Sequence, residues 1–311
     1  MTNNNKSPSI NSKEELAKVL AIELGTLEKV SKEKHYRKGK IVTNEKVREI
    51  YIADETLKKI QQNIDSKILN KIVFPPEIVG GVKGRSRSDY ALPHVKKANI
   101  AHFDIKDFFP STTPQKVFRG FRSIGIEKEA SKLLTSLVTA NNHLPIGFTT
   151  SPKISGLVLI KLNRRIKGYL DTKGAVHSIW IDDITVSGNI DLRRLKSSIK
   201  NFVQKEKYQL NLKPGKIFFA YNRQPQITAG VNVNNDISAE KKKVESIKQT
   251  IFICGKIGIE KYIKQYEPGL SKNNFVNKMS GRLGNLISIN KIKYKKLQEK
   301  WRLVLKNSRS D

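Results

Sequence analysis

A pair of adjacent aspartates within a β-prone stretch sets the tightest limit on how this chain can fold. The stretch from Ser178 to Gly188 reads SIWIDDITVSG and places Asp182 and Asp183 between two β-prone segments. This pattern predicts a hairpin with two carboxylates at its tip. Carboxylates held side by side repel each other, so a fold that keeps both usually supplies a divalent metal ion. A plain surface turn is the alternative, because aspartate is common in turns.

A third carboxylate is predicted at the end of a buried strand. The segment 98–111 reads ANIAHFDIKDFFPS, in which apolar residues alternate with His102 and Asp104. Alternation puts Asp104 on the strand face toward a cleft, where a carboxylate is costly without a partner. Further along, LPIGFTTSP at 144–152 predicts a rigid loop that ends with Ser151 as the N-cap of a long apolar helix.

The charge of the chain indicates a polyanionic partner. Lys and Arg number 59 against 28 Asp and Glu, which gives a formal net charge of +31. An excess of this size most often accompanies nucleic acid, and a basic membrane-surface protein is the rival class. No apolar run approaches about eighteen residues and the opening segment is polar, so we expect a soluble protein with no membrane partner. The single cysteine, Cys254, excludes an internal disulfide and a thiolate zinc cluster and suits a reducing cytoplasm.

Strand and helix patterns fill the rest of the chain. Residues 36–52 predict two short strands about a polar turn, with Lys46 and Arg48 on one face, where they could meet a triphosphate or simply be solvated. Residues 79–94 form a glycine-rich basic loop that could follow a phosphate backbone or serve as a surface connection. A strand is expected at 227–234, and helices are expected after Ser12, Asp54 and Thr113 and over 133–138, 192–203 and 290–307.

Taken in order, these stretches resemble a reverse transcriptase, specifically that of a bacterial retron. DIKDFFPS at 104–111 is similar to the palm motif that supplies the first catalytic aspartate, LPIGFTTSP is similar to LPQGxxTSP, and WIDD at 180–183 stands where the family has YADD. The resemblance runs from about Tyr36 to the C-terminus. It implies an α+β fold of the right-hand polymerase type, with an N-terminal helix and fingers at 1–97, a palm at 98–236 that contains a fingers insert at about 112–150, and a helical basic thumb at 237–311.

The resemblance also implies the residues of an active site. Two Mg²⁺ ions, about 3.5 to 4 Å apart, would be held at Asp104, Ile105, Asp182 and Asp183, with Asp104 and Asp182 as bridging ligands. Lys216, in LKPGK, matches the lysine near the leaving phosphate and is a candidate general acid. The deoxynucleotide would meet basic fingers residues, a steric gate against the ribose 2′-OH at Phe109, and the rigid loop. These implied contacts are Lys46, Arg48, Phe109, Ile146 and Gly147.

Two further stretches are similar to retron signatures that bear on recognition of the cognate noncoding RNA. YALPH keeps Ala91 and His94 of NAxxH but has Tyr90 in place of asparagine, and TAGVNVN resembles the VTG-containing strand with Ala229 in place of threonine. The implied RNA-binding residues are His94, Gly230, Asn234, Lys241, Lys242 and Lys243. The alternative is that His94 is structural and that Asn234 is a turn residue.

The implied function is RNA-directed DNA synthesis that starts from the 2′-OH of an internal guanosine and gives a branched RNA–DNA, within an anti-phage defence system. Partners would be the structured noncoding RNA, its DNA product, deoxynucleotides and an effector of toxin or nuclease type. No RNase H domain is expected, so template removal requires a host RNase H. The alternatives are an RNA-binding scaffold that restrains an effector, or a bacterial reverse transcriptase outside the retrons. Ile146 stands where the family has a glutamine, so shape is kept there and a hydrogen bond is lost.

Overall fold

The chain divides into two units, and each unit is built from two separate segments of the sequence. The first consists of Met1–Arg85 and Ala101–Phe219, and the second of Ser86–Ile100 and Ala220–Asp311. The computed structural model describes residues 9–43, 46–213, 215, 217–221 and 223–308, without the side chains of Thr43 and Lys46. Helices and sheets are mixed in it, in agreement with the predicted α+β class. The division into fingers, palm and thumb stays a prediction.

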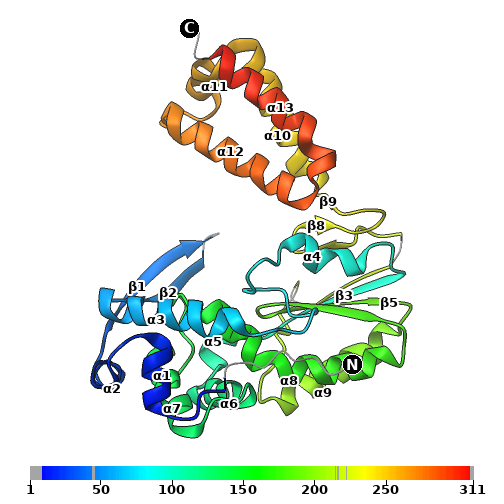
Figure 1. Cartoon of the computed structure of the whole chain (residues 1–311). Coiled ribbons are helices and arrows are strands. Elements are labelled where there is room, and N and C mark those ends of the chain that lie inside the picture. Colours follow the sequence, from blue (N-terminus) through cyan, green and yellow to red (C-terminus); the bar gives the residue numbers. More distant parts are fainter. Residues whose placement is uncertain (1–8, 44–45, 214, 216, 222, 309–311) are drawn as a thin grey trace. The chain divides into compact units, whose positions relative to one another are not determined.

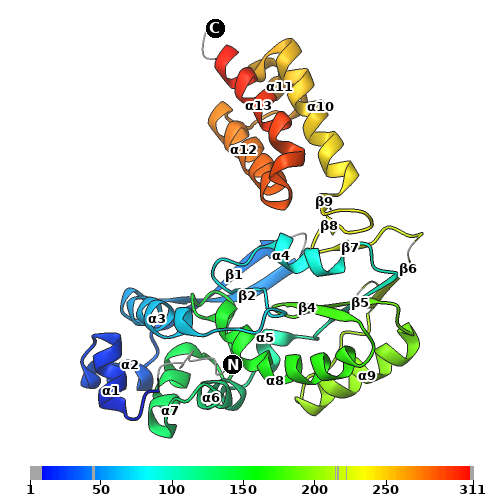
Figure 2. The same ribbon diagram turned by 45° about the vertical axis from the view of Figure 1, so that its right-hand side comes forward.

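The central sheet of the first unit carries the aspartates. Its strands lie in the order β4-β5-β3-β6, and β4 and β5 form the antiparallel hairpin that the sequence predicts, with Trp180 opposite Asp183. Helices α8 and α9 lie along one face of this sheet (Figure 1, Figure 2). The bounds are β3 (Asn99–Asp104), β4 (Val176–Trp180), β5 (Asp183–Gly188), β6 (Ile217–Tyr221), α8 (Ser151–Asp171) and α9 (Leu192–Lys205).

Two helices of the first unit, α1 (Lys13–Leu20) and α3 (Glu55–Lys67), begin at the N-caps that the sequence predicts. Ser12 Oγ accepts a hydrogen bond from the Glu15 N–H (3.1 Å), and Asp54 Oδ1 accepts one from the Leu57 N–H (2.8 Å), so both expected N-caps are confirmed. The other elements of the first unit are α2 (Leu24–Lys32), β1 (Tyr36–Thr43), β2 (Lys46–Ala53), η1 (Leu69–Lys71), α5 (Phe108–Ser111), α6 (Pro114–Ser123) and α7 (Lys128–Val138).

One expected cap lies a residue away from its predicted place. The N-cap of α8 is Thr150, and Ser151 is the first helical residue. The reason is that the Ser151 hydroxyl donates to the Pro145 carbonyl oxygen (2.6 Å) instead of accepting from the first turn of the helix. The side chain therefore closes the preceding loop.

The second unit has its own apolar core. Ala91 and Ile100 pack with Val231, Phe275 and Trp301, residues that lie far from them in sequence. Four helices, α10 to α13, make up most of this unit (Figure 1, Figure 2). The bounds are α4 (Arg87–Ala91), η2 (Leu92–His94), β7 (Ile227–Thr228), β8 (Val231–Asn232), β9 (Ser238–Ala239), α10 (Lys241–Ile257), α11 (Ile259–Tyr266), α12 (Lys272–Ile289) and α13 (Lys291–Asn307).

The prediction of a single strand at 227–234 is wrong. The structure has a tight antiparallel hairpin there, in which Ile227 pairs with Asn232 and Thr228 with Val231. Ala229 and Gly230 both have positive φ (47° and 74°), which is the backbone geometry of a two-residue hairpin turn. Alternation of apolar residues continues through such a turn, so the pattern alone does not reveal it.

A buried histidine in the first unit belongs to a polar network. His177, on β4, is 4% exposed. Its Nε2–H donates to Asn163 Oδ1 (2.8 Å), and Asn163 Nδ2 donates to Glu77 (3.3 Å). Burial lowers the pKa of His177 from 6.5 to about 4, and the nearby Glu77 carboxylate opposes this only in part. The imidazole is therefore neutral in the folded protein above this pH.

We expect the free energy of unfolding to fall as pH decreases from 6.5 towards about 4, because the unfolded chain takes up a proton at His177 and the folded chain does not. The slope contributed by this group is about 1.4 kcal/mol per pH unit. Urea unfolding of the wild type and of His177→Gln across this range measures it, since Gln can still donate to Asn163 but cannot titrate. Equal slopes for the two proteins would contradict the prediction.

Candidate active site

A pocket of about 960 Å³ in the first unit brings the predicted carboxylates together. It opens between the end of β3, the tip of the β4–β5 hairpin, strand β2 and the loop before α8. The lining residues are Val47, Arg48, Glu49, Tyr51, Asp104, Ile105, Asp107, Phe108, Phe109, Pro110, Asn141, His143, Ile146, Trp180, Ile181, Asp182, Asp183, Asn211 and Lys213.

The hairpin tip is fastened to the end of β3 through the backbone. The Ile105 N–H donates to the Asp182 carbonyl oxygen (3.0 Å), and Ile181 turns the chain at the tip with a φ of 58°. Asp182 is half-buried and Asp183 is exposed. Main-chain geometry therefore keeps these carboxylates beside Asp104, although their charges repel each other.

Asp104 is buried, with 8% of its surface exposed. Asn211 holds it in two ways: Asn211 Nδ2 donates to Asp104 Oδ2 (2.9 Å), and the Asn211 N–H donates to the Asp104 carbonyl oxygen (2.8 Å). The bond from Nδ2 supplies part of the hydrogen bonding that a buried carboxylate requires, and the main-chain bond fixes the position of Asn211. Asn211 was not among the predicted site residues. Its only signal in the sequence is its place two residues before Lys213, in the same segment as Lys216.

The loop that contains residues 77–80 packs against the β4–β5 hairpin near its tip. The Ile179 N–H donates to the Glu77 carbonyl oxygen (2.7 Å), and the Val79 N–H returns a bond to the Ile179 carbonyl oxygen (2.9 Å). A Cβ at Gly80 would lie 2.5 Å from the Ile181 nitrogen. This part of the glycine-rich basic loop is therefore packed against the site, and the absence of a side chain at Gly80 is what permits the approach.

Arg48 and Ile146, two of the predicted nucleotide contacts, line the pocket wall formed by β2 and the loop before α8, and Gly147 lies next to Ile146 in sequence. Arg48 is exposed and lines the pocket from β2. The Ile146 carbonyl oxygen accepts from the Tyr51 N–H (2.8 Å), and Gly147 follows with a φ of 108°, where a Cβ would lie 2.5 Å from the Tyr51 oxygen. Close approach of these two backbones thus sets the position of Ile146 over the pocket.

Phe109 is placed by an aromatic cluster. It is half-buried and packs edge-on against Phe108, with ring centroids 5.5 Å apart. Phe108 in turn stacks on Tyr208 at 5.4 Å, and the Tyr208 hydroxyl lies 2.9 Å from Thr112 Oγ1. Burial raises the pKa of Tyr208 above its usual value. The ring of Phe109 is therefore held at the pocket wall by neighbours that are themselves fixed.

Several predicted residues lie elsewhere. Lys216 and the side chain of Lys46 fall outside the described residues, whereas Lys213, which the sequence interpretation passed over, lines the pocket. The predicted RNA-binding residues all belong to the second unit. They comprise a fully buried histidine, a turn glycine, an asparagine that bonds within its own hairpin and three exposed lysines at the start of α10, namely His94, Gly230, Asn234, Lys241, Lys242 and Lys243.

The donor set of the pocket suits a hard divalent cation, because Asp104, Asp182 and Asp183 offer carboxylate oxygens. Ile105 has only its main-chain carbonyl oxygen to offer. Among the described residues no group of three or more His, Cys, Asp or Glu side chains is already close enough to hold a metal ion. The three carboxylates line one pocket, where a divalent cation would offset the repulsion between their charges.

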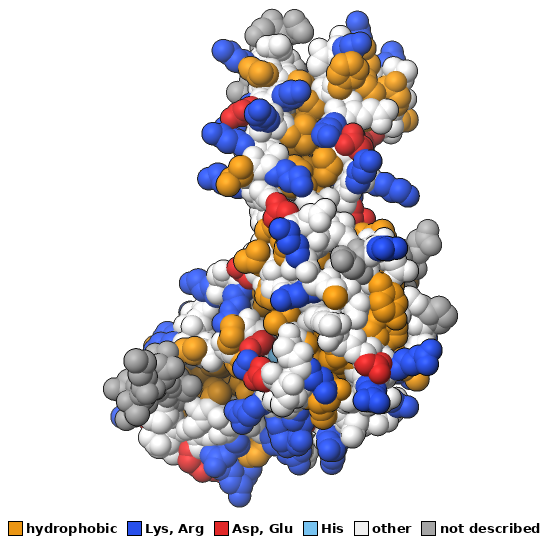
Figure 3. All heavy atoms as spheres, turned by 90° about the vertical axis from the view of Figure 1, so that its right-hand side faces the viewer, with side chains coloured by type: hydrophobic (Ala, Val, Ile, Leu, Met, Phe, Trp, Pro, Cys, Tyr) orange, Lys and Arg blue, Asp and Glu red, His pale blue; other side chains and the backbone are white. Residues whose placement is uncertain are grey.

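Outside the pocket, Lys and Arg side chains are spread over the surface and Asp and Glu are sparse on the face that Figure 3 shows. Of the helices in the described part of the chain, none is both long and apolar enough to cross a membrane.

Comparisons with known proteins place the chain beside reverse transcriptases. The family model described as Reverse transcriptase (RNA-dependent DNA polymerase) matches residues 31–251. The chain is 30% identical over 259 residues to the Retron Ec86 reverse transcriptase of Escherichia coli, covering 80% of each protein. It is 27% identical to the Retron Se72 reverse transcriptase of Salmonella heidelberg, covering 81% of this chain and 68% of that protein.

A solved structure is similar in fold. Telomerase from Candida albicans, in complex with a fragment of telomeric RNA, matches 91% of this chain and 62% of that chain with a TM-score of 0.50 and 11% sequence identity. At this identity the likeness concerns the fold, and it agrees with the predicted polymerase fold.

Gly80→Ala should lower polymerase activity by about 100-fold, because the added methyl group displaces the hairpin tip and a shift of about 1 Å at a reacting group can cost this much. Primer extension on an RNA template measures it. Gly168→Ala is the matched control, since a Cβ there meets open space on α8. Normal activity of the Gly80 variant, at a thermal midpoint equal to that of the control, would show that the tip tolerates the shift.

Proposed function

The chain belongs to the reverse transcriptase family, as an RNA-directed DNA polymerase of the bacterial retron type, and we propose that it copies part of a structured noncoding RNA into single-stranded DNA. The pocket that gathers Asp104, Asp182 and Asp183 at the junction of β3 and the hairpin carries this proposal. A polymerase needs carboxylates at the point where the primer end, the nucleotide and a divalent cation meet. The proposed metal ligands and nucleotide contacts are residues in and next to this pocket.

Membership of this family implies a polymerase that depends on a divalent metal ion. We assign Asp104 and Asp182 as the principal ligands, with Asp183 and the Ile105 carbonyl oxygen beside them, and two Mg²⁺ ions as the metal. When bound, these ions lower the pKa of the primer hydroxyl and neutralise charge on the triphosphate and the leaving pyrophosphate. Asn211 keeps the Asp104 carboxylate in one orientation by its hydrogen bond of 2.9 Å.

The chain's own residues position the nucleotide. Arg48, at the edge of the pocket, would bind the triphosphate, and Lys46 on the same strand is proposed for the same role. Phe109 would meet the 2′ position of the sugar, because the cluster behind it prevents the ring from retreating. Lys216 is proposed as the general acid for the leaving group, and Lys213, which lines the pocket, is a second candidate for that role.

The template is proposed to be a folded RNA. The net charge of +31 supports a grip on phosphates, and Lys241 to Lys243 are exposed at the start of α10. His94 is fully buried, so its contribution would be to shape the surface and not to touch the RNA. Asn234 would act in the same way, since its Oδ1 accepts from the Gln226 N–H (2.9 Å). Gly230, at the turn of the same hairpin, would let the backbone approach RNA closely.

The proposal also covers how DNA synthesis is primed and what role the product has in the cell. The relatives are named for retrons, and on this basis we propose synthesis from the 2′-OH of an internal guanosine, a branched RNA–DNA product and a role in anti-phage defence with an effector protein. Removal of the copied template would require a host RNase H. A reducing cytoplasm suits Cys254, which is buried and whose pKa burial raises to about 11.

Asp104→Asn and Asp182→Asn should each lower primer extension with Mg²⁺ by at least about 100-fold while RNA affinity stays near the wild-type value, because the charge lost lies at the chemistry and not in the basic surface. Asp171→Asn is the control, since this exposed residue forms an ion pair with Lys167 (3.2 Å) outside the pocket. Near-normal extension by either pocket variant would overturn the metal assignment.

Phe109→Ala should raise the use of ribonucleotides relative to deoxynucleotides by about tenfold, because relief of about 1.4 kcal/mol of steric strain gives this factor. Single-nucleotide incorporation with the two sugars measures the ratio. Phe218→Ala serves as the control, because Phe218 is 44% exposed on β6 and does not line the pocket. If the ratio is the same in both variants, another residue excludes the 2′-OH.

A further inference from the structure

A second concave surface lies entirely within the second unit, between α10 and α13. This groove has a volume of about 650 Å³. The two helices run in the same direction, because they are in contact at both their starts and their ends. At the starts, the Ala239 N–H just before α10 donates to the Tyr294 hydroxyl on α13 (2.9 Å). Near the ends, a Cβ at Gly255 on α10 would lie 3.6 Å from Val304 on α13. The lining residues of α10 extend from Lys241 to Phe252, about 17 Å at 1.5 Å per residue.

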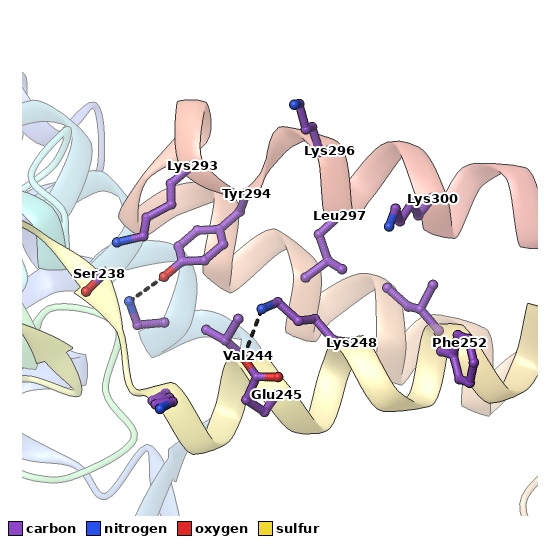
Figure 4. Close-up of a pocket in the computed structure, with 13 residues that line it drawn as sticks. Ser238, Val244, Glu245, Lys248, Phe252, Lys293, Tyr294, Lys296, Leu297 and Lys300 are labelled. Atoms are coloured by element: carbon purple, nitrogen blue, oxygen red, sulfur yellow. Dashed lines mark hydrogen bonds and ion pairs between the residues drawn. The ribbon is translucent and has the colours of Figure 1, made fainter.

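The floor of the groove is apolar. Val244, Ile251 and Tyr294 are buried there, and Leu297 points from α13 toward α10 (Figure 4). The Tyr294 hydroxyl already accepts a hydrogen bond from the Ala239 N–H. Phe252 stands at one end and is 61% exposed. Lys256 Nζ lies 4.6 Å from the centroid of this ring. A largely exposed aromatic side chain beside a concave apolar floor is typical of a binding surface.

Lysines form the rim of the groove. The lysines on each helix are spaced so that they lie on one side of it, at i and i+7 on α10 and at i, i+3 and i+7 on α13. They are Lys241 and Lys248 on α10, and Lys293, Lys296 and Lys300 on α13. Glu245 is the single acidic side chain among the described lining residues, and it pairs with Lys248 at 2.9 Å. Both members of that pair are more than half exposed (55% and 53%), so the pair is weak and open to exchange.

We propose that this groove docks an amphipathic helix of a protein partner, with an apolar stripe on one side and Asp or Glu on both flanks. An apolar floor between two basic rims complements that pattern, as in other helix-in-groove interfaces. A helix of about three turns matches the length of the groove. Nucleic acid would find donors only on the lysine rim, where Lys241 is also proposed to bind RNA, and none on the floor formed by Val244, Ile251 and Leu297. The proposal goes beyond DNA synthesis, and none of its residues lines the carboxylate pocket.

The test uses the full chain and a fluorescent synthetic peptide of about 14 residues, with Leu at i, i+3, i+4 and i+7 and Glu on the flanks. A peptide of the same composition in permuted order and an RNA–DNA duplex are the comparison probes. The groove variants are Phe252→Ala and the double variant Lys296→Glu with Lys300→Glu. The control is Lys261→Glu with Lys264→Glu, which makes the same charge change at exposed positions on α11.

We expect the ordered peptide to bind at least tenfold more tightly than the permuted one, and both groove variants to lose at least tenfold in affinity for it while the control keeps the wild-type value. Phe252→Ala should leave duplex affinity unchanged. If the groove bound its partner by charge alone, this variant would leave peptide affinity unchanged as well. Equal binding of the two peptides, or groove variants that bind the ordered peptide as wild type does, would overturn the proposal. So would a Phe252→Ala variant that loses duplex and not peptide, which would assign the groove to nucleic acid.

Discussion

The hydrogen bond from the Ile105 N–H to the Asp182 carbonyl oxygen joins the two stretches of backbone on which the pocket depends. Side chains alone would not keep three carboxylates in one place, because their mutual repulsion favours separation. A main-chain bond between β3 and the hairpin tip opposes that separation without using the carboxylate oxygens themselves. At Asp104, one carboxylate oxygen also accepts a hydrogen bond from Asn211 Nδ2 (2.9 Å). The main-chain bond between β3 and the hairpin tip thus positions the three carboxylates.

Around this junction the pocket walls are fixed mainly by backbone contacts. Gly80 lies against the hairpin tip, and Gly147 lies against β2 beside Tyr51. Position 146 is held through its carbonyl oxygen, a contact that any residue can make. This explains how an isoleucine can occupy a place where the family has glutamine without loss of the local fold. What an isoleucine changes is the side chain that lines the pocket, which is apolar at that point.

Local patterns predicted the elements that carry the carboxylates, because β-prone runs around Asp182 and an alternating strand ending at Asp104 need no distant information. The N-caps Ser12 and Asp54 were predictable for the same reason. Contacts between residues distant in sequence were not: nothing near Asn211 indicates that it bonds Asp104, 107 positions away. Burial of His94 likewise comes from tertiary packing, and the hairpin turn at Ala229 and Gly230 was hidden by alternation that continues through it.

The second unit is assembled from residues that are far apart in the order of synthesis. Segment Ser86–Ile100 belongs to it, yet Ala91 and Ile100 of that segment find their apolar partners on elements that follow Phe219. As the chain emerges from a ribosome, this segment leaves first, and its apolar partners in this core begin only at Ala220. The two segments of this unit are separated in sequence by Ala101–Phe219, which belongs to the first unit. A nascent chain that stops before α10 would hold all three carboxylates and still lack α10 to α13, the helices that make up most of the second unit.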